Sequence, residues 1–385
     1  MAEDAPLAGV RVLDLSRLFP GPYCTLLLAD LGAEVVCVDD VRGGDFLRFL
    51  PPLAPDGQGA VFHALRRGKR SVALDLRSAE GKDTLTALIG VADVLVEGFR
   101  PGVLERLGFD PHQLVDAHPG LVVCRISGYG QTGPLRLRAG HDLNYVARAG
   151  VLGMMATPDV LPMQVADLAG GSWPAALQIV SALWRRQATG KGAVIDVNMA
   201  AGARATLVMP LARRAMSRES IGGGRDLLAG AVPAYGVYPT RDGHLAVAAL
   251  EPRFFLGFLD VIGLPELKDS GLSTGHEAER VRTQIAERLR TKTTAEWVGL
   301  FDGRDVCVEP IVSPDNDDEG RAHDIGPTPV EVTIGGEVLT LPGTPLDLAA
   351  TNARPASLLG AENEEVLAAW GVQPGTAKDG IGRRP

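Results

Sequence analysis

The stretch Leu121-Val122-Val123-Cys124-Arg125-Ile126 predicts a short apolar strand, and a loop with glycines at 128, 130 and 133 follows it. Gly140-His141-Asp142-Leu143-Asn144-Tyr145 then predicts the start of a helix, whose inward face we expect to include Leu143 and Val146. Strand, glycine loop and helix in this order are typical of an α/β fold. The rest of the chain is interpreted around this unit.

The pair His141-Asp142 is the first candidate for chemistry. It places an imidazole at a helix N-terminus, where free backbone N–H groups stabilise an anion that forms on a bound substrate. Histidine is also the side chain best suited to exchanging protons near neutral pH. The pattern therefore favours a reaction through an oxyanion, while the alternative interpretation is a solvated helix cap.

Strands alternate with helices along the first half of the chain, which predicts a largely parallel, Rossmann-like sheet covered on both faces. Ligands of such sheets bind at the carboxyl ends of the strands, so the loops after residues 39, 76, 97 and 127 are candidates for one rim. A Gly-x-Gly-x-x-Gly fingerprint is missing after the first strand, so a dinucleotide cofactor is not expected. We predict strands at 9–16, 33–39, 71–76 and 92–96, and helices at 22–31, from the N-cap Ser78 to 89, and at 103–107.

The second half predicts a smaller α+β domain. Residues 164–171 open a long helix that Gly190 ends, and Asp167 in its first turn is either an N-cap or a site residue. We expect a large α/β domain over 1–200, completed by 325–385, a linker helix and glycine-rich linker over 201–228, and the small domain over 229–324. Further predicted elements are a strand at 193–199, a helix at 200–216, hairpins at 234–250 and 330–341, helices from 252, at 279–289, 294–301 and 363–370, and a strand at 306–312. The tail after Pro374 is expected to be mobile.

Composition excludes several classes of function. The chain has 385 residues, 45% of them hydrophobic and 22% charged, which is ordinary for a globular protein. Its net charge of −9 argues against nucleic acid as the main partner. No run of about 18 apolar residues is present and the N-terminus is acidic, so we expect a cytoplasmic protein without a membrane partner. The four cysteines show no metal-ligand spacing and are expected to be reduced core residues, and no metal is expected.

Arg66, Arg67, Lys69 and Arg70 form the densest basic cluster of this acidic chain. Such a cluster attracts a phosphate-bearing ligand, and the alternative is a solvated charge run.

Several motifs carry a family resemblance. The run from Ser127 to Tyr145, together with Pro20-Gly21-Pro22, Arg67-Gly68-Lys69-Arg70-Ser71 and Leu250-Glu251-Pro252, resembles the family III CoA-transferase superfamily. Gly140-His141-Asp142-Leu143-Asn144-Tyr145 is similar to the α-methylacyl-CoA racemase branch of that superfamily. The resemblance implies a CoA thioester as the substrate and no further cofactor.

The resemblance also implies roles for particular residues. His141, working with Glu251, and Asp167 would stand on opposite faces of the substrate α-carbon of a 2-methylacyl-CoA and invert it by 1,1-proton transfer through an enolate. The backbone N–H of Asp142 would bind the thioester oxygen. The resemblance assigns CoA and substrate binding to Arg42, Arg67, Lys69, Ala73, Leu74, Asp75, Leu76, Arg100, Gly140 and Tyr145. It further implies an interlocked homodimer in which Glu251 meets His141 of the other subunit.

Three departures from the branch pattern keep alternatives open. The chain has Asp39-Asp40 where the family usually has an arginine, and its own arginine comes later, at Arg42. The segment before the hairpin, Leu228-Ala229-Gly230-Ala231-Val232-Pro233, differs from the racemase form. The third departure is Gly222-Gly223-Gly224, which is loosely similar to the transferase branch. The first alternative is a CoA-transferase that moves CoA between carboxylic acids through an anhydride at Asp167. The second is an acyl-CoA binding protein without turnover.

Overall fold

The computed structural model describes residues 4–315, 328–346 and 353–373. The chain divides into two compact units. The first comprises residues 1–149, 161–206 and 325–385, and the second comprises 150–160 and 207–324. The segment 150–160 therefore belongs with the second unit, although it lies within the range predicted for the large domain. The tail after Pro374, which we expected to be mobile, lies outside the described residues.

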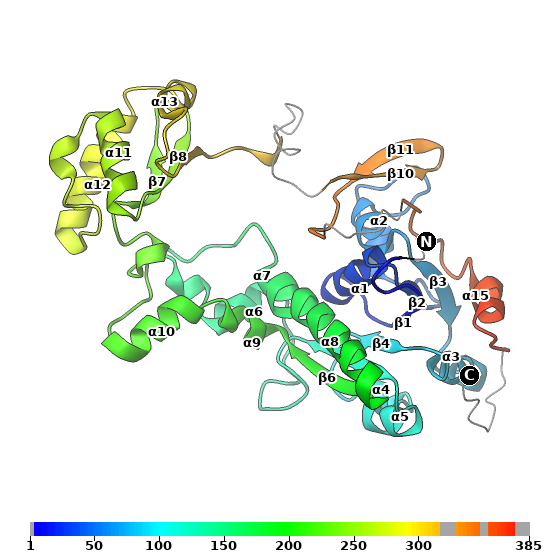
Figure 1. Cartoon of the computed structure of the whole chain (residues 1–385). Helices are drawn as coiled ribbons and strands as arrows, with labels where there is room; N and C mark the ends of the chain where they lie inside the picture. Colours follow the sequence, from blue (N-terminus) through cyan, green and yellow to red (C-terminus); the bar gives the residue numbers. More distant parts are fainter. Residues whose placement is uncertain (1–3, 316–327, 347–352, 374–385) are drawn as a thin grey trace. The chain divides into compact units, whose positions relative to one another are not determined.

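The first unit is built on a parallel sheet, as predicted (Figure 1). Within the described residues this sheet has six strands, and each pairs in parallel with its neighbours. The order of strands reverses between β1 and β4, and a crevice for ligands forms at such a switch point. Across the sheet the strands are β3 (Arg70–Leu74), β2 (Glu34–Asp40), β1 (Arg11–Asp14), β4 (Val94–Glu97), β5 (Val122–Ser127) and β6 (Ala193–Asn198).

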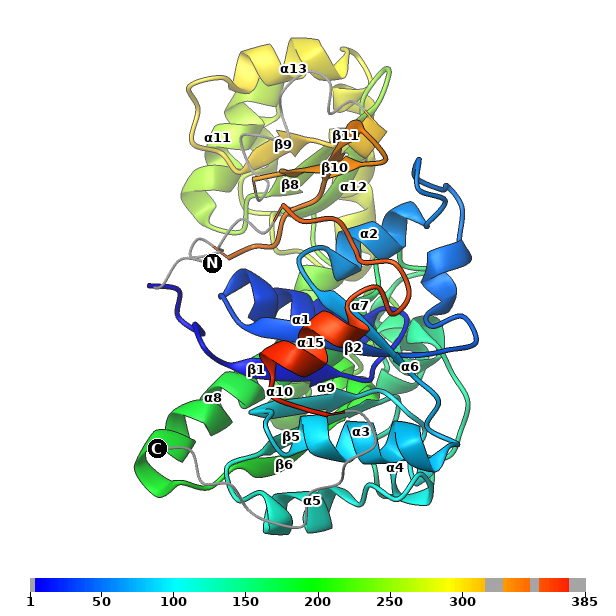
Figure 2. The same ribbon diagram turned by 90° about the vertical axis from the view of Figure 1, so that its right-hand side faces the viewer.

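Helices cover both faces of this sheet. The helices α1 (Pro20–Asp30) and α8 (Trp173–Thr189) contact each other and pack on one face, α1 on β1 and β2 and α8 on β5 and β6. The other face carries α3 (Ala79–Ile89), α4 (Val103–Arg106), α5 (Pro111–Ala117) and α15 (Asn363–Ala369), and α3 and α15 lie in front of the sheet in Figure 2. All residues of β4 and β5 are buried, because both of their faces are covered.

The core of the second face follows the alternation of side chains along the strands. Leu13, Val36 and Val123 point to that face and are fully buried against the helices. Helix ends follow local chemistry: the Ser78 hydroxyl accepts the Gly81 N–H at 3.0 Å and begins α3, and Gly190, with φ of 67°, ends α8. Both ends agree with the sequence-based prediction.

Other local predictions were wrong. The helix expected from residue 164 is interrupted: α7 (Val165–Asp167) is followed by a π-helical turn, η3 (Leu168–Ser172), before α8 begins. The single helix expected at 200–216 consists of α9 (Met199–Ala205) and α10 (Val208–Ser217). Tertiary contact explains the π turn, since Gly170 packs so closely on α9 that a Cβ at that position would lie 2.2 Å from the Met199 carbonyl oxygen. Sequence patterns had not predicted α2 (Ala60–Arg66), α5 or the 3-10 turns η1 (Phe46–Phe49) and η2 (Leu152–Met154).

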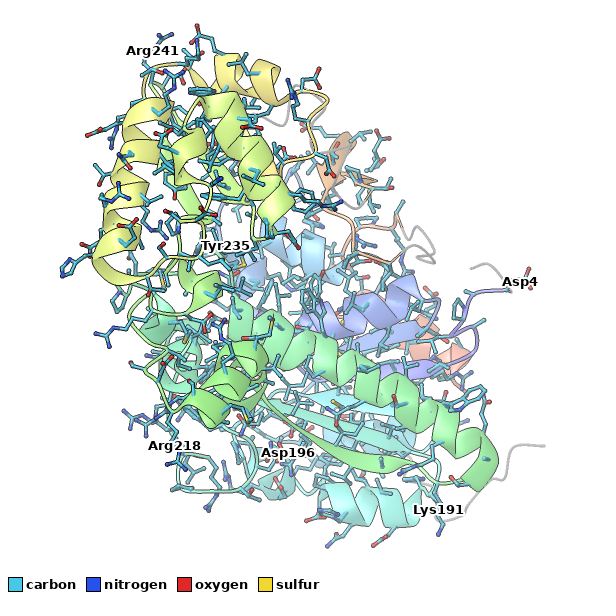
Figure 3. All side chains as sticks on the ribbon, turned by 60° about the vertical axis from the view of Figure 1, so that its left-hand side comes forward. Asp4, Lys191, Asp196, Arg218, Tyr235 and Arg241 are labelled. Atoms are coloured by element: carbon cyan, nitrogen blue, oxygen red, sulfur yellow. The ribbon has the colours of Figure 1, made fainter. Side chains whose placement is uncertain are left out.

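The second unit is an α+β fold around its own core. The predicted hairpin is present as β7 (Tyr235–Pro239) and β8 (His244–Ala248), and β9 (Val308–Pro310) pairs with β8. Figure 3 labels Arg241 at the hairpin turn, where its guanidinium donates to the Glu296 carboxylate at 3.2 Å. The helices of this unit are α11 (Pro252–Ile262), α12 (Gly275–Leu289) and α13 (Thr294–Phe301), with η4 (Leu227–Ala229) and η5 (Pro265–Leu267) between the longer elements.

The C-terminal segment returns to the first unit. The hairpin β10 (Val330–Ile334) and β11 (Glu337–Leu341) turns at Gly335-Gly336, as predicted. The Asn363 side chain then accepts the Ala73 N–H at 2.9 Å and donates to the Ala73 carbonyl at 3.2 Å. This amide holds α15 against the edge strand β3.

Candidate functional site

A cavity of about 680 Å³ opens at the carboxyl ends of the central strands. Its walls include the segments that follow β1, β4 and β5, together with Met199 at the start of α9. This is the switch point of the parallel sheet, where the alternating pattern predicts a ligand site. The lining residues of these segments are Arg17 to Gly21, which reach the first turn of α1, then Gly98 to Pro101, and Ile126 to Gly128 at the end of β5.

His141 and Asp167 both line this cavity. His141 immediately precedes α6 (Asp142–Ala149), and its backbone N–H donates to the Asn144 side chain at 3.0 Å. Asp167 is the last residue of α7. The chain thus brings an exposed imidazole and a half-buried carboxyl group from two separate elements to one hollow. The first N–H groups of α6, including that of Asp142, have no acceptor within the helix itself.

Asp142 and Asp167 are directly connected. The Asp167 backbone N–H donates to the Asp142 carboxylate at 2.9 Å. The Asp142 side chain therefore serves a neighbouring element, where the sequence had suggested a cap for its own helix. Asp167 does not cap a helix either, since its side chain accepts no capping hydrogen bond. Burial, and after it the negative charge of Asp142, raises the pKa of Asp167 to about 7.

Tyr145 forms the wall between the glycine loop and α6. Its hydroxyl donates to the Gly140 carbonyl at 2.5 Å, and its ring meets Tyr129 edge to face with 5.2 Å between centroids. Gly128 is required beside it, because a Cβ there would lie 2.4 Å from the tyrosine ring. Val146 is fully buried as predicted, whereas the prediction that Leu143 faces inward was wrong, since it is 43% exposed.

Four arginines line the cavity, and only Arg100 among them was predicted to be a site residue. Arg17 follows β1, and Arg136 and Arg138 lie in the segment that leads to His141. Asp167 is the one carboxylate among the lining residues of this cavity, so its described walls carry an excess of positive charge. The rule that ligands bind at strand carboxyl ends identifies Arg17, but no local pattern distinguishes Arg136 and Arg138 from solvated arginines.

A smaller pocket of about 150 Å³ is lined by four of the ten residues expected to bind CoA and the substrate. Arg42, Leu74, Asp75 and Leu76 line it, while Ala73, Leu74 and Asp75 line a third pocket, of about 760 Å³, beside α15. The Arg42 guanidinium donates to the Asp40 carboxylate at 2.9 and 2.6 Å. Arg17 and Phe99 line both this pocket and the cavity of His141, so the two hollows adjoin.

Three members of the basic cluster are buried, so the alternative of a solvated charge run was wrong for them. Arg66, Arg67 and Lys69 are 3%, 1% and 1% exposed. The reason is pairing with buried carboxylates, which compensates the cost of removing the charges from water. Arg66 contacts Asp45 and Asp14, Arg67 contacts Asp30, and Lys69 lies 3.6 Å from Asp14.

Buried side chains of this cluster hold the segment that lines the cavity after β1. Arg66 donates to the Ser16 carbonyl at 2.9 Å, and Lys69 donates to the Pro22 carbonyl at 2.7 Å. Asp45, which pairs with Arg66, also accepts the Leu18 N–H at 3.0 Å. The loop from Arg17 to Gly21 is therefore held at both ends by buried charges. The charged groups of Arg67 and Lys69 lie inside the protein beside buried carboxylates. Neither residue lines either of the two adjoining hollows.

Glu251 belongs to the second unit. It is exposed and directly precedes α11, and its side chain makes no capping hydrogen bond. Cys24, Cys37 and Cys124 are free and buried, as expected, whereas Cys307 is exposed. The described residues contain no group of three or more His, Cys, Asp or Glu side chains that could hold a metal ion. In the same residues, no helix combines the length and apolar character needed to cross a bilayer.

Comparison with known proteins decides the family. The model of CoA-transferase family III matches residues 7–360. The chain belongs to CoA-transferase family III. It is 35% identical to the α-methylacyl-CoA racemase of Mus musculus over 95% of this chain and 93% of that protein. It is also 32% identical to the succinyl-CoA:glutarate CoA-transferase of the same organism, over 80% of this chain and 72% of that one.

Solved structures of the family agree with this fold. The crystal structure of a CAIB/BAIF family protein from Brucella suis superimposes with a TM-score of 0.81 at 25% identity. The match covers 95% of this chain and 99% of that chain. Racemases and transferases both occur among the relatives of this family III enzyme, so the family alone leaves its reaction open.

Proposed function

We propose that this family III enzyme inverts the α-carbon of 2-methylacyl-CoA thioesters by 1,1-proton transfer through an enolate. The observation that carries the proposal is the single cavity lined by His141 and Asp167, two proton carriers from different elements. The racemase relatives, at 35% and 37% identity, support the same reaction.

Each residue has a defined task in this reaction. One carrier removes the α-proton, the negative charge moves onto the thioester oxygen, and the Asp142 N–H at the start of α6 stabilises it. The second carrier then delivers a proton to the opposite face of the carbon. Neutral histidine with protonated aspartic acid, and imidazolium with carboxylate, hold the same number of protons. One ionisation state of the site therefore accepts either epimer.

The protonation of Asp167 supports this assignment. Because burial and Asp142 raise its pKa to about 7, a substantial fraction of Asp167 carries a proton at neutral pH. A general acid works best when its pKa lies near the working pH. A carboxylate that acts as a nucleophile, in contrast, must be deprotonated.

Binding of CoA is proposed along the two adjoining hollows. The thioester would occupy the cavity beside Gly140 and Tyr145, with Arg100 at its mouth, and the nucleotide would extend past Phe99 to Arg42 and the strand end at Leu74 to Leu76. Guanidinium groups suit phosphates because they carry a permanent charge and several donors. The buried Lys69 would contribute by holding the segment from Arg17 to Gly21, and Arg67 by holding the end of α1 through Asp30.

The enzyme is further proposed to work as an interlocked homodimer in the cytoplasm, in which Glu251 of one subunit orients His141 of the other. Support for an interface comes from α8. Trp173, Leu177 and Trp184 are 47%, 69% and 73% exposed on this helix, and apolar patches of this kind mark contact surfaces.

The competing candidate is CoA transfer between carboxylic acids, with Asp167 as the nucleophile. Relatives with this activity are 30 to 34% identical to the chain. A transferase forms a mixed anhydride at Asp167 and has no use for a proton carrier on the other face. The role of His141 therefore distinguishes the two reactions.

The decisive experiment is deuterium incorporation at the α-carbon of a 2-methyl-branched acyl-CoA of defined configuration in D₂O, without an acceptor acid. We expect exchange accompanied by inversion, and we expect both to collapse in His141→Ala while acyl-CoA binding by calorimetry persists. Transfer of CoA to an added carboxylate, with hydroxylamine trapping at Asp167, would instead establish the transferase. Binding without either turnover would establish the third reading, a non-catalytic acyl-CoA binding protein.

A further inference from the structure

We propose that the Asp142 carboxylate is a positioning residue that fixes the turn carrying Asp167 and keeps this carboxyl group available as a proton donor. The inference deepens the proposed racemase function and rests on it. It gives the side chain of Asp142 a task separate from that of its backbone N–H.

The first support is the hydrogen bond between the two residues. Asp142 begins α6, and its carboxylate accepts the Asp167 N–H at 2.9 Å across 25 positions of the chain. The element that carries Asp167 is weakly held by local structure, since α7 spans only Val165–Asp167 and leads into the π turn η3. A bond to a charged acceptor is stronger than one between neutral groups. It therefore sets the position of Asp167 relative to α6 and His141.

The second support is the electrostatic environment of Asp167. Asp142 of α6 accepts the Asp167 N–H, Tyr145 of the same helix and the adjoining His141 line the same cavity as Asp167, and the Tyr145 hydroxyl donates to the Gly140 carbonyl. The charged residue of the neighbouring α9 is Arg204, whose guanidinium donates to the Ala149 carbonyl. The turn Leu168–Ser172 carries no charged residue. Asp142 is thus the charged group that acts on Asp167. Burial is the larger cause and Asp142 the second cause of the rise in the pKa of Asp167 to about 7.

Both parts of Asp142 then assist the same reaction. Its N–H faces an oxygen that becomes negative, and its carboxylate faces an acid that must retain a proton until the enolate forms. Arg17, Arg100, Arg136 and Arg138 line the same cavity. They are not among the groups that shift the pKa of Asp167, whose proton is favoured by burial and by the carboxylate of Asp142.

Asp142→Asn tests the inference, because the amide keeps an acceptor for the Asp167 N–H and removes the charge. We expect the carboxyl ¹³C resonance of Asp167, assigned with Asp167→Asn, to titrate at a pH lower by about one unit. The pH profile of α-deuterium exchange should shift to lower pH by a similar amount, since the site binds its protons less tightly. Asp142→Ala, which also loses the acceptor, should lower kcat at least tenfold further, with a smaller change in KM.

Asp196→Asn is the matched control. Asp196 lies on β6 (Figure 3), and its exposed carboxylate accepts the Gln131 N–H at 3.0 Å without lining the cavity. This variant should reproduce the wild-type titration and pH profile. An Asp167 titration that is unchanged in Asp142→Asn, in a protein with the wild-type circular dichroism spectrum, would overturn the inference. The NMR titration needs no turnover, so this result is distinct from failure of the racemase proposal, which would appear as absence of exchange in the wild type.

Discussion

The guanidinium of Arg67 donates two hydrogen bonds to the carboxylate of Asp30, both at 2.6 Å. Each residue is 1% exposed, and the Thr344 hydroxyl donates to the same carboxylate at 2.6 Å. Three parts of the first unit meet at this carboxylate: the last residue of α1, the segment before β3, and the returning C-terminal segment. The pair therefore has a structural role in the described chain.

Replacing Arg67 should unfold the protein more easily. Arg67→Ala leaves Asp30 buried without its main partner, and breaking a buried ion pair in this way costs about 3–5 kcal/mol. Urea unfolding followed by circular dichroism measures the loss. The matched control is Arg280→Ala, which removes an exposed pair with Glu277 and should leave the free energy of unfolding nearly unchanged. Equal, small losses in both variants would show that the buried pair adds nothing to stability.

The contact between Gly128 and Tyr145 predicts a defect confined to the site. In Gly128→Ala the new Cβ would lie 2.4 Å from the Tyr145 ring, so the ring must move and its bond to the Gly140 carbonyl must break. Because Gly140 directly precedes His141, we expect kcat for α-proton exchange to fall at least tenfold. Gly299→Ala, where a Cβ meets nothing within 4 Å, should keep wild-type turnover. Wild-type turnover in both variants would refute the role of this contact.

The raised pKa of Asp167 predicts a gain of stability when the carboxyl group is removed. Between its ordinary value of 3.8 and about 7, the folded protein binds more protons at Asp167 than the unfolded chain does. Stability contributed by this group therefore decreases as the pH rises through that interval. Asp167→Asn should be inactive, more stable than wild type by about 1–4 kcal/mol at pH 8, and nearly equal to it at pH 4.

Urea unfolding of both proteins at the two pH values tests this prediction. A stability difference that is the same at pH 4 and pH 8 would mean that Asp167 has an ordinary pKa in the folded protein.

The proposed sharing of sites between subunits predicts complementation. His141→Ala and Glu251→Gln should each be inactive as homodimers. A mixed dimer made by co-expression with two affinity tags would contain one site with both wild-type residues, and we expect about half of the wild-type activity per dimer. If both residues act within one chain, each site of the mixed dimer carries one defect, and the purified heterodimer should remain inactive.

Local sequence patterns determine much of this fold. Alternation of apolar strands with capped helices predicts the parallel sheet. An apolar run and a capping residue are both recognisable within a short stretch of sequence. Ser78 and Gly190 mark their helix ends correctly for the same reason. His141 lies near the carboxyl end of a strand because the strand, the glycine loop and the helix follow one another within one short stretch of chain.

Tertiary structure decided what depends on distant partners. Nothing near Arg66, Arg67 and Lys69 in the sequence indicates that carboxylates from other segments bury them, and nothing near Asp167 indicates that Asp142 accepts its N–H. Arg136 and Arg138 face the same cavity as Asp167 only because of how the loops fold. A sequence shows which residues are charged, but long-range packing decides which of them are buried and how they pair. Burial and pairing in turn determine where the site lies and how its acidic groups are protonated.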